Sequence, residues 1–268
     1  MDRDAKKMTT HKLYHGDNLQ ILKQHIADQS VNLIYIDPPF NTGKSQERIT
    51  NGKRIYYSDK FESLQKYLEF LEPRLREAYR VLDPQGSLFV HLDYRAVHYC
   101  KVLLDNIFGE ESFMNEIIWA YDFGARMKNK WSTKHDNILW YAKDPNQYTF
   151  NYDIMDRIPY MAPGLAGKEK AAIGKTPTDV WWHTIVHTRG AEKTGYPTQK
   201  PIGIINRIVK IHSSPEDTLL DFFAGSGTLG EVAAMYNRSS ILVDNNEPAI
   251  KIIMDRLRFY GIELHNER

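Results

Sequence analysis

The chain has 268 residues, 42% of them apolar, and a formal net charge of +1. This length supports one sizeable core and is short for two full domains, and the near-neutral charge excludes a polycation, so any nucleic-acid binding must come from local clusters. The single cysteine excludes a disulfide framework, and no stretch is typical of a signal peptide or a membrane span, so we expect a cytoplasmic protein with no membrane partner and no metal site.

Alternating apolar runs and amphipathic stretches predict strands and helices in turn along the first half of the chain. Strands are expected at 12–14, 31–36, 86–92, 117–121 and 137–141, and helices at 18–29, 64–82 and 97–107. The run 31–36 is apolar except for Asn32, which is typical of a parallel strand buried on both faces. Residues 41–60 are polar and contain Asn51-Gly52, so we expect a mobile loop there.

Periodicity fades between residues 144 and 199, where prolines and glycines recur, and then returns. Helices are expected at 201–212, 229–236 and 247–260, and strands at 218–222 and 241–243. Strands that alternate with helices predict an α/β fold with a wound sheet. We therefore expect one domain over residues 1–268, with a small inserted region at about 144–199.

A glycine loop follows the strand at 218–222, with the sequence Asp221-Phe222-Phe223-Ala224-Gly225-Ser226-Gly227-Thr228. Glycines let the backbone turn sharply and approach a ligand, and N–H groups at the start of the next helix favour a negative group such as a carboxylate. Asp244 ends the following strand, where an acid typically binds ribose hydroxyls. The letters also fit G-x-G-x-x-G through Gly230, so a nucleotide-binding dehydrogenase stays open, whereas a Walker loop does not fit.

The segment Asp37-Pro38-Pro39-Phe40 ends the buried strand at 31–36, at the edge where open α/β sheets bind ligands. Its two prolines fix φ and hold the turn rigid. The Asp37 carboxylate and a nearby backbone carbonyl can accept both hydrogens of an amino group, which directs the nitrogen lone pair towards an electrophile. Phe40 offers a flat face on which a base can stack. Taken alone, the segment is also compatible with a strand-ending turn that carries a solvated acid.

These motifs and their order resemble the β group of the S-adenosylmethionine-dependent DNA amino-methyltransferases. The order is Gly16-Asp17-Asn18, the Asp-Pro-Pro-Phe turn, the irregular stretch, Pro197-Thr198-Gln199-Lys200-Pro201, and last the glycine loop. The resemblance covers nearly the whole chain. It implies a Rossmann-like methyltransferase fold with a circularly permuted motif order and a mixed, mostly parallel seven-stranded sheet with helices on both faces.

The resemblance also implies roles for the turn. Asp37 and the Pro38 carbonyl would hold the target amine, Pro39 would complete the pocket, and Phe40 would stack on a flipped base. An aspartate at the start of the turn favours adenine N6 as the acceptor, at a short specific DNA sequence, with direct in-line transfer after base flipping. A cytosine-N4 enzyme of the same fold, an RNA or protein methyltransferase, and a non-catalytic DNA-binding subunit stay open as alternatives.

The implied cofactor is S-adenosylmethionine, which carries the activated methyl group itself, so no metal is required. The implied cofactor-binding residues are Asp17, Lys200, Asp221, Phe223, Gly225, Ser226, Gly227, Thr228 and Asp244. Among them, Asp17 would lie beside the adenine ring of the cofactor, Asp244 would bind its ribose, and Lys200 would approach its carboxylate. Phe222, Ala224 and Leu229 depart from the commonest family residues, but the glycines and the leading acid are kept.

Basic residues cluster near tryptophans, which indicates contacts to DNA phosphates, although lysine runs are otherwise typical of a solvated face. The first cluster is Arg126, Lys128, Lys130 and Lys134, and the second is Lys168, Lys170, Lys175, Arg189 and Lys193. Within the family, the stretch 144–199 would be the target-recognition region, and double-stranded DNA the partner. The resemblance leaves open a homodimer and a cognate restriction endonuclease.

Overall fold

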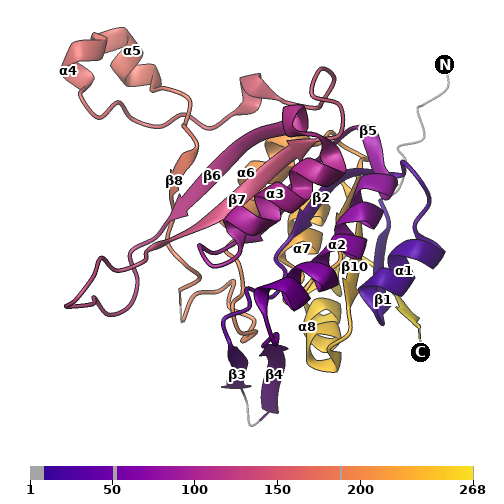
Figure 1. The fold of residues 1–268 in the computed structure, drawn as a ribbon. Coiled ribbons are helices and arrows are strands. Elements are labelled where there is room, and N and C mark those ends of the chain that lie inside the picture. Colours follow the sequence, from indigo (N-terminus) through magenta and orange to yellow (C-terminus); the bar gives the residue numbers. More distant parts are fainter. Residues whose placement is uncertain (1–8, 51–52, 188, 268) are drawn as a thin grey trace, which may run out of the picture.

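The computed structural model describes residues 9–50, 53–187 and 189–267, and a central sheet runs through it (Figure 1). Among the described residues this sheet has nine strands, in the order β11-β1-β10-β9-β2-β5-β7-β6-β8. The strands are β1 (His11–His15), β2 (Val31–Ile36), β5 (Leu82–Leu92), β6 (Phe113–Ala120), β7 (His135–Ala142), β8 (Val180–Trp182), β9 (Thr218–Asp221), β10 (Ser239–Asp244) and β11 (Ile262–Asn266).

All neighbouring strands pair in parallel except β7, which is antiparallel to both β5 and β6. This confirms the mixed, mostly parallel sheet. Among the described residues the sheet has two strands more than the expected seven, because the short strands β8 and β11 pair along its two edges. Neither gives a clear sequence pattern, because β8 has only three residues and β11 is largely polar.

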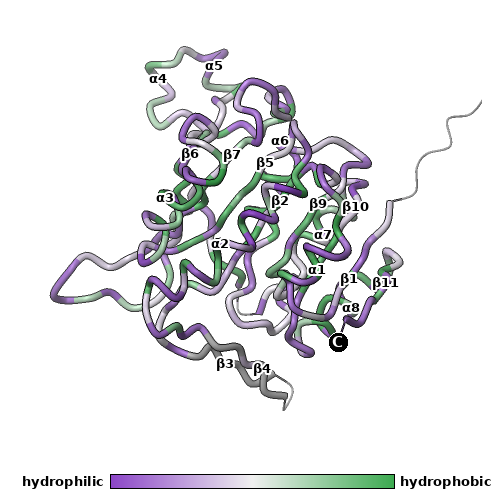
Figure 2. Tube along the Cα trace, turned by 45° about the vertical axis from the view of Figure 1, so that its right-hand side comes forward, coloured by the Kyte–Doolittle hydropathy of each residue, from purple (hydrophilic) through white to green (hydrophobic). Residues whose placement is uncertain are grey.

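Helices cover both faces of the sheet, as expected (Figure 1). The helices α1 (Asn18–His25), α2 (Leu64–Val81) and α3 (Val97–Phe108) contribute to one core, and α6 (Ile202–His212), α7 (Thr228–Met235) and α8 (Glu247–Leu257) contribute to the other. Strand β2 serves both cores, since Ile34 and Ile36 pack into the first and Leu33 and Tyr35 into the second. This explains why β2 is apolar at every position except Asn32, and Figure 2 shows this strand at the centre of the sheet.

Residues 41–60 do not form the expected mobile loop. Strands β3 (Lys44–Thr50) and β4 (Lys53–Asp59) pair as an antiparallel hairpin, from Lys44 opposite Asp59 to Thr50 opposite Lys53. Its segments carry β-branched and aromatic residues that favour strands, and Asn-Gly is a strong hairpin signal. The expectation of a loop followed the polar composition of residues 41–60 and overlooked these strand-favouring residues. Asn51-Gly52 itself lies outside the described residues.

The stretch 144–199 holds more regular structure than the sequence predicts. It contains the helices α4 (Pro163–Ala166) and α5 (Lys168–Ile173) as well as β8, and the short 3₁₀ helix η2 (Tyr152–Ile154). Neither α4 nor α5 buries a residue, and both stand away from the body of the protein (Figure 1). Two backbone hydrogen bonds between Ile158 and Lys175, at 2.8 and 2.9 Å, close this segment, which we call the arm (residues 158–175).

The remaining expected elements agree to within a few residues, and a further 3₁₀ helix, η1 (Glu110–Ser112), precedes β6. The helix expected to reach residue 29 ends at His25, and the closing helix ends at Leu257. Within the part of the chain that the structure describes, no helix is long and apolar enough to cross a membrane.

The sheet topology brings three acids to one edge. The strands β2, β9 and β10 are adjacent and parallel, so their carboxyl ends open on the same side. Asp37 directly follows β2, Asp221 ends β9, and Asp244 ends β10. In open α/β sheets ligands bind at the carboxyl ends of the strands, where the chain order switches. The fold therefore places both sequence motifs where a shared site can form.

Candidate active site

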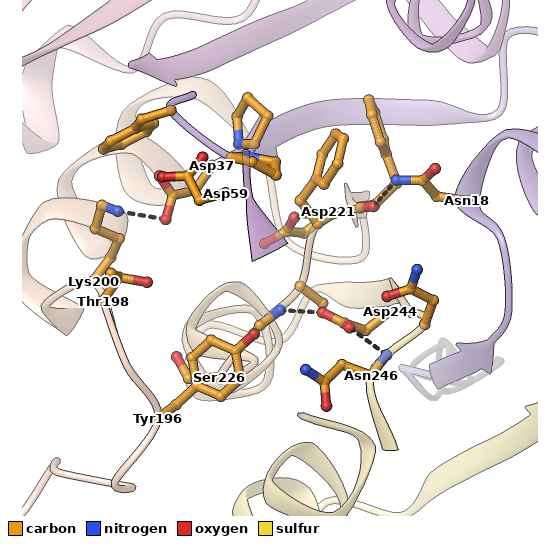
Figure 3. A pocket seen from close by; sticks show the side chains of 18 of the residues that line it. Asn18, Asp37, Asp59, Tyr196, Thr198, Lys200, Asp221, Ser226, Asp244 and Asn246 are labelled. Carbon is orange, nitrogen blue, oxygen red and sulfur yellow. Dashed lines mark hydrogen bonds and ion pairs between the residues drawn. The ribbon is translucent and has the colours of Figure 1, made fainter. Parts of the chain in front are cut away.

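A cavity of about 700 Å³ opens at this edge of the sheet, and both motifs line it (Figure 3). The Asp-Pro-Pro-Phe turn lines it together with the glycine loop, the segment from Tyr196 to Lys200, and the base of the β3–β4 hairpin. All the predicted catalytic and cofactor-binding residues line the cavity except Gly227. Two segments far apart in sequence thus meet across one site.

The Asp37 carboxylate has two different oxygens. Its Oδ2 forms an ion pair with Nζ of Lys200, and the Lys200 side chain is only 9% exposed. Its Oδ1 is buried and has no hydrogen-bond partner among the described residues. An unsatisfied buried acceptor costs about 1–3 kcal/mol. The site therefore favours a ligand that brings a hydrogen-bond donor to Oδ1.

Asp59, which ends β4, fixes the backbone just after the turn. Its buried carboxylate accepts hydrogen bonds from the N–H groups of Asn41 (2.7 Å) and Thr42 (3.2 Å) and from the Thr42 hydroxyl (2.5 Å). Asn41 has φ +54°, a region that Asn tolerates better than most residues. Sequence reasoning missed Asp59 because it treated the hairpin as a loop; the strand-favouring residues around Asn51-Gly52 were the available signal.

A buried polar network supports Phe40 from behind. His91, which is fully buried on β5, stacks its ring on Phe40 with the ring centres 5.9 Å apart. Its Nδ1 lies 2.7 Å from the Tyr35 hydroxyl, and its Nε2 lies 3.1 Å from Oδ2 of Asp136, which also accepts from Tyr121. Burial alone would raise the pKa of Asp136, but its contact with His91 lowers it. The network therefore holds the Phe40 ring in one orientation.

The glycine loop turns at two residues in the left-handed region, Gly225 with φ +51° and Gly227 with φ +71°. The Gly225 N–H donates to Oδ2 of Asp244 at 2.8 Å, which ties the loop to the end of β10. Asp221 is buried and accepts from the Phe223 N–H at 2.9 Å. Burial, with the nearby charges of Asp37 and Asp244, raises the pKa of Asp221 well above its usual value, so its carboxyl serves to shape the loop.

The other side of the cavity is built around Arg74, a buried residue of α2 that sequence reasoning missed. Its Nη2 donates to Oδ2 of Asp17 at 3.1 Å, and its Nε donates to Oδ1 of Asn18 at 2.7 Å. Asn18 in turn donates to the Phe222 carbonyl at 2.7 Å. Arg74 lies on the buried face of α2 with Leu71, which distinguishes it from the exposed basic residues of that helix.

Asn246 joins the hairpin to the side of the cavity that carries Asp244. Its N–H donates to Oδ1 of Asp244 at 2.8 Å, and its Nδ2 donates to the Tyr56 carbonyl of β4 at 2.8 Å. The segment before α6 is held by Gln199, whose Oε1 accepts from the Thr194 N–H at 2.9 Å and whose Nε2 donates to the Glu192 carbonyl at 2.6 Å. The Asn246–Tyr56 contact was invisible in the sequence because it joins residues 190 positions apart.

The first basic cluster lies on the cavity side of the sheet. Strand β6 runs parallel to β2, so the loop 121–134 that follows it projects from the edge where the cavity opens. This loop carries Arg126, Lys128 and Lys130, and its Trp131 is 97% exposed. Lys134 instead donates to carbonyls of its own loop, at 3.2 Å from Gly124 and 3.3 Å from Ala125.

The residues of the second basic cluster lie at opposite ends of the strands. Strand β8 is parallel to β6. The arm, which carries Lys168, Lys170 and Lys175, precedes β8 and therefore lies at the amino ends of the strands, opposite the cavity. Arg189 and Lys193 follow β8 and lie on the cavity side. The structure does not bring the three arm lysines to the cavity, and their contact with DNA stays a prediction.

Comparison with known proteins decides the family. The N6/N4 methyltransferase model, described as DNA methylase, matches residues 31–255. The chain belongs to this DNA methylase family. It is 32% identical over 247 residues to the type II methyltransferase M.HpaI of Haemophilus parainfluenzae, across 91% of this chain and 74% of that protein. It is 31% identical over 258 residues to the DNA adenine methyltransferase YhdJ of Escherichia coli K12, across 91% of this chain and 82% of that protein.

The fold of this DNA methylase is also shared by a solved structure. The crystal structure of the M1.HpyAVI–SAM complex matches with a TM-score of 0.64 at 21% identity, over 92% of this chain and 99% of that chain. The cofactor is S-adenosylmethionine. The residues present fit this group, because the glycine loop leaves room for a close backbone approach and Asp244 lies beside it as a hydrogen-bond acceptor.

We expect the cofactor affinity of the DNA methylase to fall in mild acid. Burial raises the pKa of Asp244 to about 6. The ionised carboxylate can accept from Gly225, Asn246 and a ribose hydroxyl at once, whereas the protonated carboxyl has less acceptor capacity. The Kd for S-adenosylmethionine should therefore rise as the pH falls below about 6. Isothermal titration calorimetry between about pH 5 and pH 8 measures this, and Asp244→Asn should bind weakly with a flat profile. A flat profile in the wild type would contradict this.

The same group has a defined effect on stability. Its folded-state pKa lies above its ordinary value of 3.8, so the folded protein binds the proton more tightly than the unfolded chain does. Its contribution to the free energy of unfolding is therefore greatest below that ordinary value, and it is lost as the pH rises through about 6.

Proposed function

We propose that the protein is a site-specific DNA methyltransferase that moves a methyl group from S-adenosylmethionine to the exocyclic N6 of adenine in a short DNA sequence. The observation that carries this proposal is the orphaned Oδ1 of Asp37, a buried acceptor in a rigid turn that faces the cofactor loop across one cavity. An exocyclic amino group is a donor that can satisfy it. The adenine assignment is supported by the leading aspartate and by the activity named for YhdJ.

In the proposed reaction the protein acts by holding its substrates. The target adenine is swung out of the duplex, at a cost of a few kcal/mol, and is received on the face of Phe40. Asp37 Oδ1 and the Pro38 carbonyl accept the two amino hydrogens, so the lone pair faces the cofactor. The bound cofactor supplies a methyl group on a positively charged sulfur. The new N–C bond forms as the C–S bond breaks, and Asp37 Oδ1 lies where it can accept the surplus proton.

The direct test is to identify the methylated nucleoside. The purified protein is incubated with duplex DNA of mixed sequence and S-adenosylmethionine, and the digest is analysed by mass spectrometry against N6-methyldeoxyadenosine and N4-methyldeoxycytidine standards. We expect the adenine product alone. The cytosine product alone would establish the alternative that the family description also covers. Cofactor binding without any DNA product would instead favour a non-catalytic subunit, or an enzyme that acts on RNA or protein.

The proposed partners follow from this function. Double-stranded DNA is the substrate, and the cytoplasm is the proposed location. M.HpaI is named as a type II methyltransferase, so we include a cognate restriction endonuclease among the proposed partners. A homodimer rests on the family resemblance alone. Sequencing that detects methylated bases in DNA from cells expressing the chain would give the recognised sequence directly.

DNA binding should depend on salt through the loop 121–134. Each phosphate that the protein neutralises contributes about −0.9 to the slope of log K against log salt. The combined substitutions Arg126→Ala, Lys128→Ala and Lys130→Ala should therefore reduce the magnitude of the slope by about 0.9 for each phosphate that is no longer neutralised. The same substitution of Lys168, Lys170 and Lys175 tests whether the arm also contacts DNA, as the sequence predicts. An unchanged slope would exclude the arm lysines from the DNA contact. An equal reduction would place the arm on the DNA.

A further inference from the structure

We propose that Lys200 is a positioning residue that orients the Asp37 carboxylate for the target amine, and that it is not primarily a ligand of the cofactor's carboxylate. This inference rests on the proposed function and deepens it, because it assigns the arrangement of the amine-binding group to a residue outside the Asp-Pro-Pro-Phe turn. The family resemblance by itself implies the cofactor as the partner of Lys200.

The Lys200 ammonium contacts both side chains that would hold the base. Its Nζ forms an ion pair with Oδ2 of Asp37, and it lies 5.0 Å from the centre of the Phe40 ring. Figure 3 shows the side chain directed at Asp37 and away from Asp244. A cation over an aromatic face is attractive in its own right. One ammonium group therefore connects the acid to the stacking surface.

The ion pair makes the two carboxylate oxygens of Asp37 unequal. A free carboxylate can turn about its Cβ–Cγ bond and present either oxygen. Here Oδ2 is taken by Lys200, so Oδ1, which has no partner among the described residues, is the oxygen left for a donor. The amine of the base would therefore meet one acceptor at a fixed position. In-line transfer needs such precision, since reacting atoms must be held at about 3–3.5 Å.

The backbone of Lys200 is itself tied to the cofactor loop. Its carbonyl accepts from the Thr228 hydroxyl at 3.2 Å, at the start of α7. The N–H of Ile202, at the start of α6, donates to Oε2 of Glu192 at 3.1 Å, which holds the segment on its other side. The Thr228–Lys200–Asp37 path thus links the loop that binds the methyl donor to the acid that holds the acceptor. The ammonium and the backbone carbonyl of one lysine thus contact both sides of the cavity.

The test separates catalysis from cofactor binding in three variants. Lys200→Met keeps the apolar length without the charge, Lys200→Ala leaves space, and Lys200→Arg keeps the charge. For each, kcat is measured at saturating DNA and cofactor, and the Kd for S-adenosylmethionine is measured by calorimetry. We expect Lys200→Met to lose about 100-fold in kcat, the loss that a misplacement of about 1 Å produces. Its cofactor Kd should stay within about threefold of the wild type, and Lys200→Arg should retain most activity.

Chemical rescue gives a readout that a general loss of stability would not produce. Ethylammonium fits the space that Lys200→Ala opens beside Asp37, so it should restore kcat in that variant. It should not restore Lys200→Met, in which the side chain fills the same space. If both of these variants fail to fold, Lys200→Gln, which keeps polarity and most of the length without the charge, replaces them, and the same loss of kcat is expected.

The results that would overturn the inference differ from those that would overturn the proposed function. A wild-type protein that methylates no DNA refutes the function, and with it this inference. An active wild type whose Lys200→Met or Lys200→Gln variant keeps its kcat but binds the cofactor about 100-fold more weakly makes Lys200 a cofactor ligand and refutes the inference alone. A Lys200→Met or Lys200→Gln variant whose kcat and cofactor Kd both equal those of the wild type also refutes the inference.

Discussion

Replacing Asp37 with alanine should reduce kcat for DNA methylation about 1,000-fold, which is the scale of losing one group that is oriented towards the reacting atoms. The substitution removes the orphaned Oδ1 acceptor and also leaves the buried Lys200 ammonium without its partner. Among the described residues the glycine loop forms no hydrogen bond with either oxygen of Asp37, so cofactor binding should persist. Initial rates at saturating substrates, with a parallel calorimetric Kd for S-adenosylmethionine, measure both effects.

The matched control is Asp255→Ala, which removes an exposed acid from the last turn of α8. It should leave kcat and cofactor affinity unchanged. Two outcomes would contradict the assignment of Asp37. Retained methyl transfer in Asp37→Ala would show that the carboxylate does not hold the amine, and an equal loss of cofactor binding would place Asp37 in the cofactor site.

Replacing Gly225 with valine should weaken S-adenosylmethionine binding at least about tenfold. A residue other than glycine at φ +51° costs about 1–2 kcal/mol, and a β-branched residue costs more. A Cβ at this position would also lie 3.1 Å from the Tyr196 ring, and the two methyl groups beyond it would have to displace the ring or enter the cavity. Calorimetry of cofactor binding measures the loss, and DNA methylation should fall with it at subsaturating cofactor.

Gly164→Val is the control for this prediction. Gly164 lies in α4 of the arm, and a Cβ there would meet no atom within 4 Å. The variant should bind the cofactor as the wild type does. If Gly225→Val also keeps its affinity, the cofactor does not lie against the loop as proposed.

The cavity was predictable because parallel strands end at one edge of a sheet. The apolar runs before Asp37, Asp221 and Asp244 identified three such strands, and the fold rule then placed the three acids together. Nothing in a local pattern could pair Lys200 with Asp37 or Arg74 with Asp17, since these contacts join side chains 163 and 57 positions apart. Periodicity reports which face a residue occupies but not its partner on another element.

Two further differences have different physical causes. The hairpin at 44–59 was missed because polar composition was given more weight than strand propensity on both sides of Asn-Gly. The second basic cluster was predicted because its residues are close in sequence. Strand β8, however, runs between Lys175 and Arg189 and carries the chain from the amino ends of the strands to their carboxyl ends. One short strand thus separates in space residues that are close in sequence.

The arm has a consequence for engineering. Its two ends are hydrogen-bonded to each other at Ile158 and Lys175, and its helices α4 and α5 bury nothing against the rest of the molecule. A foreign sequence whose ends also meet can be grafted there without breaking any rung of the main sheet. A fluorescent or affinity module carried at this position would report on the protein while its bulk stays remote from the cavity.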